Sequence, residues 1–133
     1  MKEVIAIIRM NMINKTKEAL LREGFPALSA NKVLGRGKKK VDFSFIENML
    51  SGDEMSTVNE FTSPVIAEAL TEGQRLIPKR MLSIVARDDE IKTIVDVIIS
   101  VNQQGKPGDG KIFVMPVLDC VRVRTGETGE LAL

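Results

Sequence analysis

The spacing of hydrophobic residues near the start of the chain predicts a strand, a helix and a second strand. Glu3–Arg9 is rich in Ile and Val and too short for a helix, which indicates a buried strand. Asn14 is suited to cap a helix over Lys15–Glu23, and Gly24 stands where glycine commonly ends one. Pro26–Leu34 alternates weakly, which favours another strand before a glycine-rich break.

The second half of the chain predicts the same succession with one strand added. Arg80–Ala86 has the composition of a strand, and Asp88 is suited to cap the helix that follows. The apolar positions of that helix follow the spacing of an amphipathic helix and are Ile91, Ile94, Val95, Ile98 and Ile99. The remaining elements are a turn over Gln103–Gly110 and strands over Lys111–Val114 and Val117–Arg124, separated by a break at Pro116.

Two strand–helix–strand units in one chain predict an α+β fold, the ferredoxin-like βαββαβ sandwich. We expect a single domain over residues 1–133, with an extended loop at 38–77 after the second strand and a C-terminal tail at 125–133. Within the loop, Ser63–Leu70 resembles a short helix. The sheet face that no helix covers must contact something, and packing of identical chains through their sheets would cover it.

Composition excludes several classes of function. The chain has no His, Trp or Tyr, which excludes imidazole catalysis and the usual zinc ligands and argues against an aromatic platform for nucleic acid. The single cysteine, Cys120, excludes an internal disulfide and is expected to be an inert residue of a core strand. The sequence contains no run of about 18 apolar residues, so no membrane span is predicted. A single cysteine makes the cytoplasm the expected compartment.

The net charge of +1 conceals an uneven distribution of charge. Residues 41–77 contain seven acidic residues and one basic residue, a net charge of −6, whereas the rest contain 18 Lys and Arg and 11 Asp and Glu, a net charge of +7. This asymmetry indicates two tasks, an anionic ligand for the basic body and a partner for the acidic segment. A solvated loop that keeps the protein dispersed is the alternative.

Glycine turns and basic side chains predict a polyphosphate site. Gly108-Asp109-Gly110-Lys111 places glycines, which allow close approach of a phosphate, beside a positive charge. Arg122 and Arg124 lie two apart on a predicted strand and would share one face, where an anion would relieve their repulsion. Gly35–Lys40 is a glycine turn with a basic run, and Lys79 opens a strand. Each of these features also occurs in ordinary turns and exposed faces; together they favour phosphate binding over catalysis.

These segments resemble the signature of the PII signal-transduction family. The resemblance is carried by Gly105–Val114 and Val121–Glu127, with further similarity at Ala6–Arg9 and Lys17–Leu20, and it covers 1–37 and 78–130. It implies a trimer of ferredoxin-like subunits with ATP or ADP in the clefts between them. It also implies that 2-oxoglutarate binds next to the ATP phosphates and that a long loop contacts the regulated protein.

The resemblance implies a set of ligand-binding residues. Those for ATP are Ser29, Gly35, Gly37, Lys38, Gly108, Gly110, Lys111, Arg122 and Arg124, with the two arginines coming from the neighbouring subunit. Those for 2-oxoglutarate are Lys39, Lys79 and Gly108. Lys39 replaces a glutamine that helps hold Mg²⁺ in the family, and a charged lysine cannot ligate a metal, so the use of Mg²⁺ is left open.

The lengthened loop without tyrosine resembles the nitrogen-fixation-operon branch of the family. That branch implies a regulator, not an enzyme, that forms a homotrimer or a hetero-oligomer with a PII paralogue and inhibits dinitrogenase until 2-oxoglutarate and ATP release it. The residues expected to contact the partner are Phe43, Phe45, Ile46, Met49, Leu50, Val65, Ile66 and Leu70. A PII regulator of an ammonium transporter or of glutamine synthetase is the alternative. A phosphohydrolase or an RNA-binding domain on the same fold is less consistent with the missing histidines and aromatic residues.

Overall fold

Residues 1–37 and 76–133 are described by the computed structural model. They form β1 (Lys2–Arg9), α1 (Ile13–Arg22), β2 (Ser29–Gly35), β3 (Ile77–Ala86), α5 (Ile91–Asn102) and β4 (Lys111–Pro116). Two short 3₁₀ helices, η1 (Met10–Met12) and η2 (Gly129–Ala132), precede α1 and follow β4. The helix predicted at Ser63–Leu70 lies outside the described residues.

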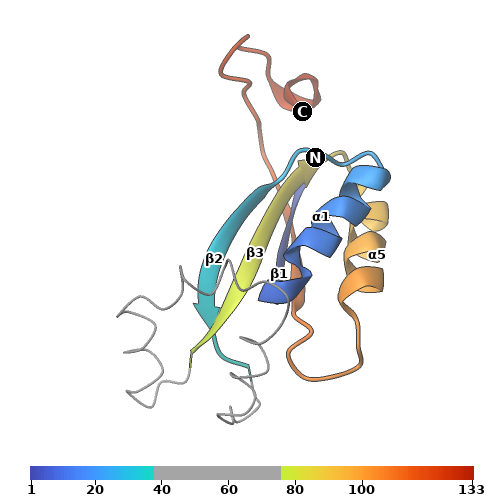
Figure 1. Ribbon diagram of the computed structural model, residues 1–133. Helices are drawn as coiled ribbons and strands as arrows, with labels where there is room; N and C mark the ends of the chain where they lie inside the picture. Colours follow the sequence, from blue (N-terminus) through green and yellow to red (C-terminus); the bar gives the residue numbers. More distant parts are fainter. Residues whose placement is uncertain (38–75) are drawn as a thin grey trace.

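The described strands form one antiparallel sheet in the order β2-β3-β1-β4. Both βαβ halves contribute, so that β1 and β3 lie side by side in the centre of the sheet. Helices α1 and α5 lie on the same face of the sheet (Figure 1). This arrangement confirms the predicted ferredoxin-like sandwich.

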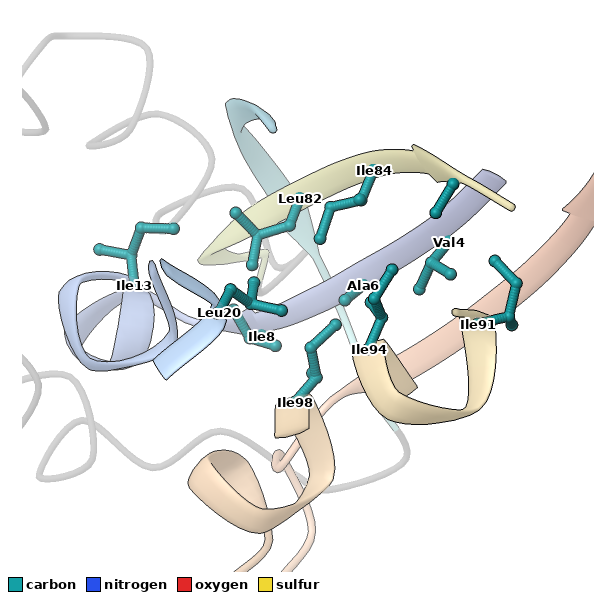
Figure 2. Packing of buried hydrophobic residues seen from close by; sticks show 11 residues of the cluster. Val4, Ala6, Ile8, Ile13, Leu20, Leu82, Ile84, Ile91, Ile94 and Ile98 are labelled. Carbon is teal, nitrogen blue, oxygen red and sulfur yellow. The ribbon is translucent and has the colours of Figure 1, made fainter. Parts of the chain in front are cut away.

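The hydrophobic core fills the space between the sheet and the two helices. Directly opposite residues of an antiparallel pair share a face, so Ala6 of β1 and Leu82 of β3 both point toward the helices and are fully buried. Figure 2 shows the cluster, which comprises Val4, Ala6, Ile8, Ile13, Leu20, Leu82, Ile84, Ala86, Ile91, Ile94 and Ile98.

Helix α1 begins two residues earlier than predicted. Asn14 lies inside the helix and is not its cap, because the helix starts at Ile13 and Met12 occupies the N-cap position without a side-chain cap. The turn η1 runs directly into α1, and the N–H of Ile13 donates to the carbonyl of Met10. The helix therefore continues from a backbone turn and does not begin at a polar capping side chain.

The capping residue predicted for α5 is also wrong. Asp88 accepts a hydrogen bond from the amino group of Met1 at 2.8 Å, which fixes the carboxylate away from the helix. Glu90 occupies the N-cap position, and its side chain accepts a hydrogen bond from the N–H of Arg87 at 2.9 Å. The N-cap position therefore lies two residues later than the sequence suggested, and the Glu90 carboxylate bonds the turn before the helix and no N–H of the helix itself.

The predicted apolar face of α5 is correct except at Ile99. Ile91, Ile94 and Ile98 are buried, but Ile99 is 42% exposed. Eight residues from Ile91, it is rotated by about 80° around the helix axis and leaves the buried stripe. Asn102 is buried in the last turn instead, where its amide donates a hydrogen bond to the Thr16 hydroxyl at 3.0 Å and links the two helices.

Two predicted strands shift at their ends. β2 begins at Ser29, not at Pro26, since proline has no N–H for the ladder and the chain is still turning after α1. β3 begins at Ile77, three residues before the predicted start at Arg80, because its first residues pair with the end of β2 at Gly35.

The strand predicted over Val117–Arg124 is wrong. β4 continues to Pro116 and ends there, and in the residues that follow, Val121 alone makes a bridge, with Thr128. Leu118 and Val123 are each 99% exposed, because no neighbouring strand or helix of the described chain covers them. Cys120 lies in this irregular segment, so it is partly exposed and not a residue of a core strand.

The second face of the sheet carries apolar side chains that neither helix covers. Phe113 and Met115 of β4 are 44% and 41% exposed. They lie opposite Ile5 and Glu3 in the register, and Ile5 lies opposite Ser83 of β3. This face is the surface that the sequence predicted to pack against another copy of the chain.

Candidate functional site

Several predicted site residues meet at one end of the sheet. β1 and β2 end there, at Arg9 and Gly35, and β3 and β4 begin there with Lys79 and Lys111 near their first residues. The turn over residues 103–110, which joins α5 to β4, lies at the same end (Figure 1). Antiparallel pairing therefore brings together residues from four separate parts of the sequence.

The turn before β4 has a backbone that only glycine accommodates. Gly108 and Gly110 have φ angles of +105° and +123°. A Cβ on Gly110 would lie 2.1 Å from the carbonyl oxygen of Ile7, well inside van der Waals contact. Glycine at position 110 therefore lets the turn pack directly against the backbone of β1.

An ion pair fixes this turn to the rest of the fold. Asp109 Oδ2 accepts hydrogen bonds from the N–H groups of Gln104 at 2.7 Å and Lys106 at 3.3 Å. Chiefly because of the Gln104 hydrogen bond, and with a contribution from Arg9, the pKa of Asp109 lies below its usual value. Arg9 Nη2 lies 3.5 Å from Asp109 Oδ1 and donates to the carbonyl of Asn102 at 2.7 Å, while Nη1 donates to the Gln104 side chain.

Lys79 points from β3 toward the glycine turn. Its Nζ donates a hydrogen bond to the carbonyl oxygen of Gly108 at 3.1 Å. Burial lowers the pKa of Lys79, and the nearby Arg9 guanidinium lowers it further, whereas Asp109 acts in the opposite direction. Two cations with only one carboxylate between them leave a surplus of positive charge beside the turn, which an anionic ligand would neutralise.

The two predicted arginines lie at the other end of the sheet. β4 leaves the glycine turn at Lys111 and reaches its far end at Pro116, opposite Lys2. Arg122 and Arg124 follow in the C-terminal segment beyond that end (Figure 1). They do not share a strand face as predicted, because the chain turns over 123–125.

The other residues predicted to bind ligands are also divided between the two ends of the sheet. Gly37 follows β2 at the end occupied by Lys79, but Ser29 begins β2 and lies about 20 Å along the strand from Gly35. Lys38, Lys39 and the residues predicted for partner binding lie outside the described part of the chain. The structure thus brings together Lys79, the glycine turn and the start of β4, and separates them from Ser29 and both arginines.

Sequence reasoning missed the residues that hold the site in shape. Arg9 ends an apolar strand and Asp109 was noted only as part of a turn, so nothing in their spacing along the chain connects them. The connection becomes visible only in the structure, where β1 pairs with β4 and Arg9 lies beside the turn that precedes β4. Glu127, which contacts Arg122, was noted only as part of a longer motif.

Residues 1–37 and 76–133 contain no group of three or more acidic, cysteine or histidine side chains placed to bind a metal ion. In the same residues, neither helix has the length and hydrophobicity needed to cross a bilayer.

The described residues form a small ferredoxin-like sandwich with a glycine turn and the basic Lys79 at one end of its sheet. Residues 1–127 match the model of the family described as Nitrogen regulatory protein P-II, and the chain belongs to that family. The identification made from the glycine turn and the C-terminal motif is therefore confirmed.

Individual relatives match along their whole length. The chain is 45% identical to "Nitrogen fixation nifHD region GlnB-like protein 2" of Methanobacterium ivanovii, with 100% of this chain and 99% of the relative covered. It is 46% identical to the protein of the same name from Methanothermococcus thermolithotrophicus, with 100% and 98% covered. It is 33% identical to "Nitrogen regulatory protein P-II" of Cereibacter sphaeroides, with 100% of both covered. The chain is thus a P-II-type nitrogen regulatory protein similar to the nifHD-region proteins.

Proposed function

We propose that this protein is a non-enzymatic cytoplasmic sensor that binds ATP or ADP together with 2-oxoglutarate and regulates nitrogenase. The functional unit is a trimer, formed by this chain alone or with a P-II paralogue, with nucleotide in the clefts between subunits. Membership of the P-II family and similarity to the nifHD-region proteins support this proposal.

The separation of the glycine turn from the two arginines supports a nucleotide site shared between subunits. The glycine turn and Lys111 lie at one end of the sheet, whereas Arg122 and Arg124 lie beyond the other. A single chain therefore cannot surround one triphosphate with all of these groups. A neighbouring subunit that supplies the two arginines completes the site, and packing through the apolar sheet face accounts for the exposed Phe113 and Met115.

The residues of this chain have distinct roles in the proposed site. Backbone N–H groups at Gly108 and Gly110 and the ammonium of Lys111 hold the phosphates. Lys79 exchanges its hydrogen bond with the Gly108 carbonyl for one carboxylate of 2-oxoglutarate. Since Gly108 borders both ligands, ATP prepares the site that 2-oxoglutarate enters, and the pair of ligands shifts the 38–77 loop away from its partner-binding state.

Light scattering tests the assembly. We expect the mass of three chains, or of a larger hetero-oligomer when a paralogue is co-expressed, because the sheet face and the divided site both require neighbours. A monomer whose mass does not change with concentration would contradict both the trimer and the shared nucleotide site.

A pull-down from extract, with and without ATP plus 2-oxoglutarate, tests the target. We expect dinitrogenase to be retained without the ligands and released with them. Deleting 44–76 should spare trimer formation and ATP binding but abolish inhibition of the target. Retention of an ammonium transporter or glutamine synthetase instead would replace nitrogenase as the target, and a deletion variant that inhibits normally would refute the role of the loop.

A further inference from the structure

Arg122 is engaged by an acidic side chain of its own C-terminal segment. Glu127 Oε2 accepts a hydrogen bond from Arg122 Nη1 at 2.7 Å, and the Thr125 hydroxyl donates to the same oxygen at 2.8 Å. Arg122 Nη2 donates to the carbonyl of Leu133 at 2.8 Å. The backbone closes the same small loop, since the N–H of Arg122 donates to the carbonyl of Glu127 at 2.9 Å. The guanidinium therefore already has two acceptors within its own chain, one of them charged.

Arg124, two residues further on, provides a contrast. Within residues 1–37 and 76–133 its guanidinium takes part in neither a hydrogen bond nor an ion pair. Both arginines were predicted to bind phosphate, yet only Arg122 has a carboxylate already bound to it. A phosphate that binds Arg122 must displace Glu127, whereas a phosphate that binds Arg124 displaces no carboxylate of the described residues.

We propose that Glu127 is an internal counter-ion that competes with the nucleotide phosphates for Arg122 and thereby lowers the nucleotide affinity of the site. This inference rests on the proposed function, because it assumes that Arg122 reaches a nucleotide. In this role Glu127 affects nucleotide binding through Arg122, without contacting the nucleotide itself.

The exposure and the chemistry of the pair make this exchange feasible. The side chains of Arg122 and Glu127 are 33% and 44% exposed, so a ligand can approach the pair and water can solvate the released carboxylate. Ion pairs in such positions contribute little to stability because solvent screens them. A phosphate carries more charge than a carboxylate, and it can bind both Nη1 and Nη2, whereas Glu127 contacts Nη1 alone and Nη2 donates to the Leu133 carbonyl. A phosphate therefore displaces Glu127 at a modest cost in affinity.

Calorimetric titration of the full-length protein with ATP at low ionic strength tests the competition. Glu127→Gln keeps the size of the side chain and removes its charge, and we expect it to bind ATP about threefold more tightly than the wild type. Glu130→Gln is the matched control, because Glu130 lies on the same segment and its side chain makes no hydrogen bond or ion pair with the described residues. It should leave the ATP affinity unchanged, which separates the exchange at Arg122 from a general change in charge.

A double-mutant cycle shows whether the effect passes through Arg122. Arg122→Ala should weaken ATP binding by about tenfold, the loss expected for one charge-assisted contact. Adding Glu127→Gln to Arg122→Ala should then give no gain, since the competitor has lost the group it competes for. A merely structural contribution of Glu127 would persist in this background.

The outcomes separate the two proposals. If Glu127→Gln binds ATP more weakly, Glu127 orients Arg122 toward the ligand and the competition is refuted. Equal affinity of wild type and Glu127→Gln, or an equal gain in Glu130→Gln, also overturns it while leaving the nucleotide site intact. If neither the wild type nor Glu127→Gln binds ATP, the proposed function itself fails, and the inference that rests on it fails with it.

Discussion

Gly110→Ala is expected to abolish nucleotide binding and to lower the melting temperature by about 10 °C. At φ +123° an alanine is strained, and its Cβ would lie 2.1 Å from the Ile7 carbonyl oxygen. Either the turn or the pairing of β4 with β1 must move to relieve this overlap. In both cases the backbone of the turn loses the shape proposed for phosphate contact. Thermal unfolding and ATP titration below the transition measure the two effects separately.

Gly24→Ala provides the control for this substitution. Gly24 also has a positive φ, +88°, but a Cβ there would meet nothing within 4 Å. It follows α1, away from the glycine turn, so alanine should cost only the strain of about 1–2 kcal/mol and leave ATP binding unchanged. If the two variants melt alike and bind ATP alike, the contact between the turn and Ile7 does not shape the site.

Local sequence patterns were sufficient for the parts of the fold that depend on a single buried face. Ile91, Ile94 and Ile98 identified α5 because helix period and burial agree there. The run of Ile and Val predicted β1 within one residue of its observed start at Lys2. Capping was less predictable, since Asp88 and Asn14 each had an alternative partner or position that depends on tertiary contacts.

The C-terminal segment shows where pattern alone is insufficient. The apolar residues Val117, Leu118, Val121 and Val123 favour a strand, but a strand also needs an edge to pair with, and β propensity depends strongly on that context. In the described chain β4 ends at Pro116, and the side chains of Leu118 and Val123 remain exposed. A second subunit would cover these side chains in the proposed trimer. The hydrophobic pattern of one chain does not indicate contacts between subunits.

The sequence predicted which residues belong to the candidate site, but not how they contact one another in space. Lys111 was identified from the glycine motif and Lys79 from the family resemblance, but the sheet register is what directs Lys79 toward Gly108. Arg9 and Asp109 are 100 positions apart in the sequence, and their ion pair forms because β1 pairs with β4. Contacts of this kind depend on the topology, and residue type alone does not indicate them.

Lys79→Ala is expected to abolish the response to 2-oxoglutarate while leaving most of the ATP affinity. Lys79 supplies the ammonium proposed to pair with a ligand carboxylate, a contact worth roughly 1.5–3 kcal/mol, or about tenfold to a hundredfold in affinity. Titration of 2-oxoglutarate with and without ATP measures both the loss and the coupling. Lys17→Ala, which removes one charge from the exposed side of α1, should behave as the wild type. Equal binding of 2-oxoglutarate to nucleotide-free protein would contradict the proposed coupling.

The pH dependence of 2-oxoglutarate binding gives a second measure of the same residue. The carboxylate requires the charged form of Lys79, and burial together with the Arg9 charge lowers the pKa of Lys79 in the free protein. As pH rises through that lowered pKa, the ammonium loses its proton and affinity falls, at a lower pH than for an exposed lysine. Arg9→Ala removes a neighbouring cation, so it should raise the pKa of Lys79 and move the fall in affinity to higher pH. A profile that is unchanged in Arg9→Ala, or that persists in Lys79→Ala, would show that a different group controls the binding of 2-oxoglutarate.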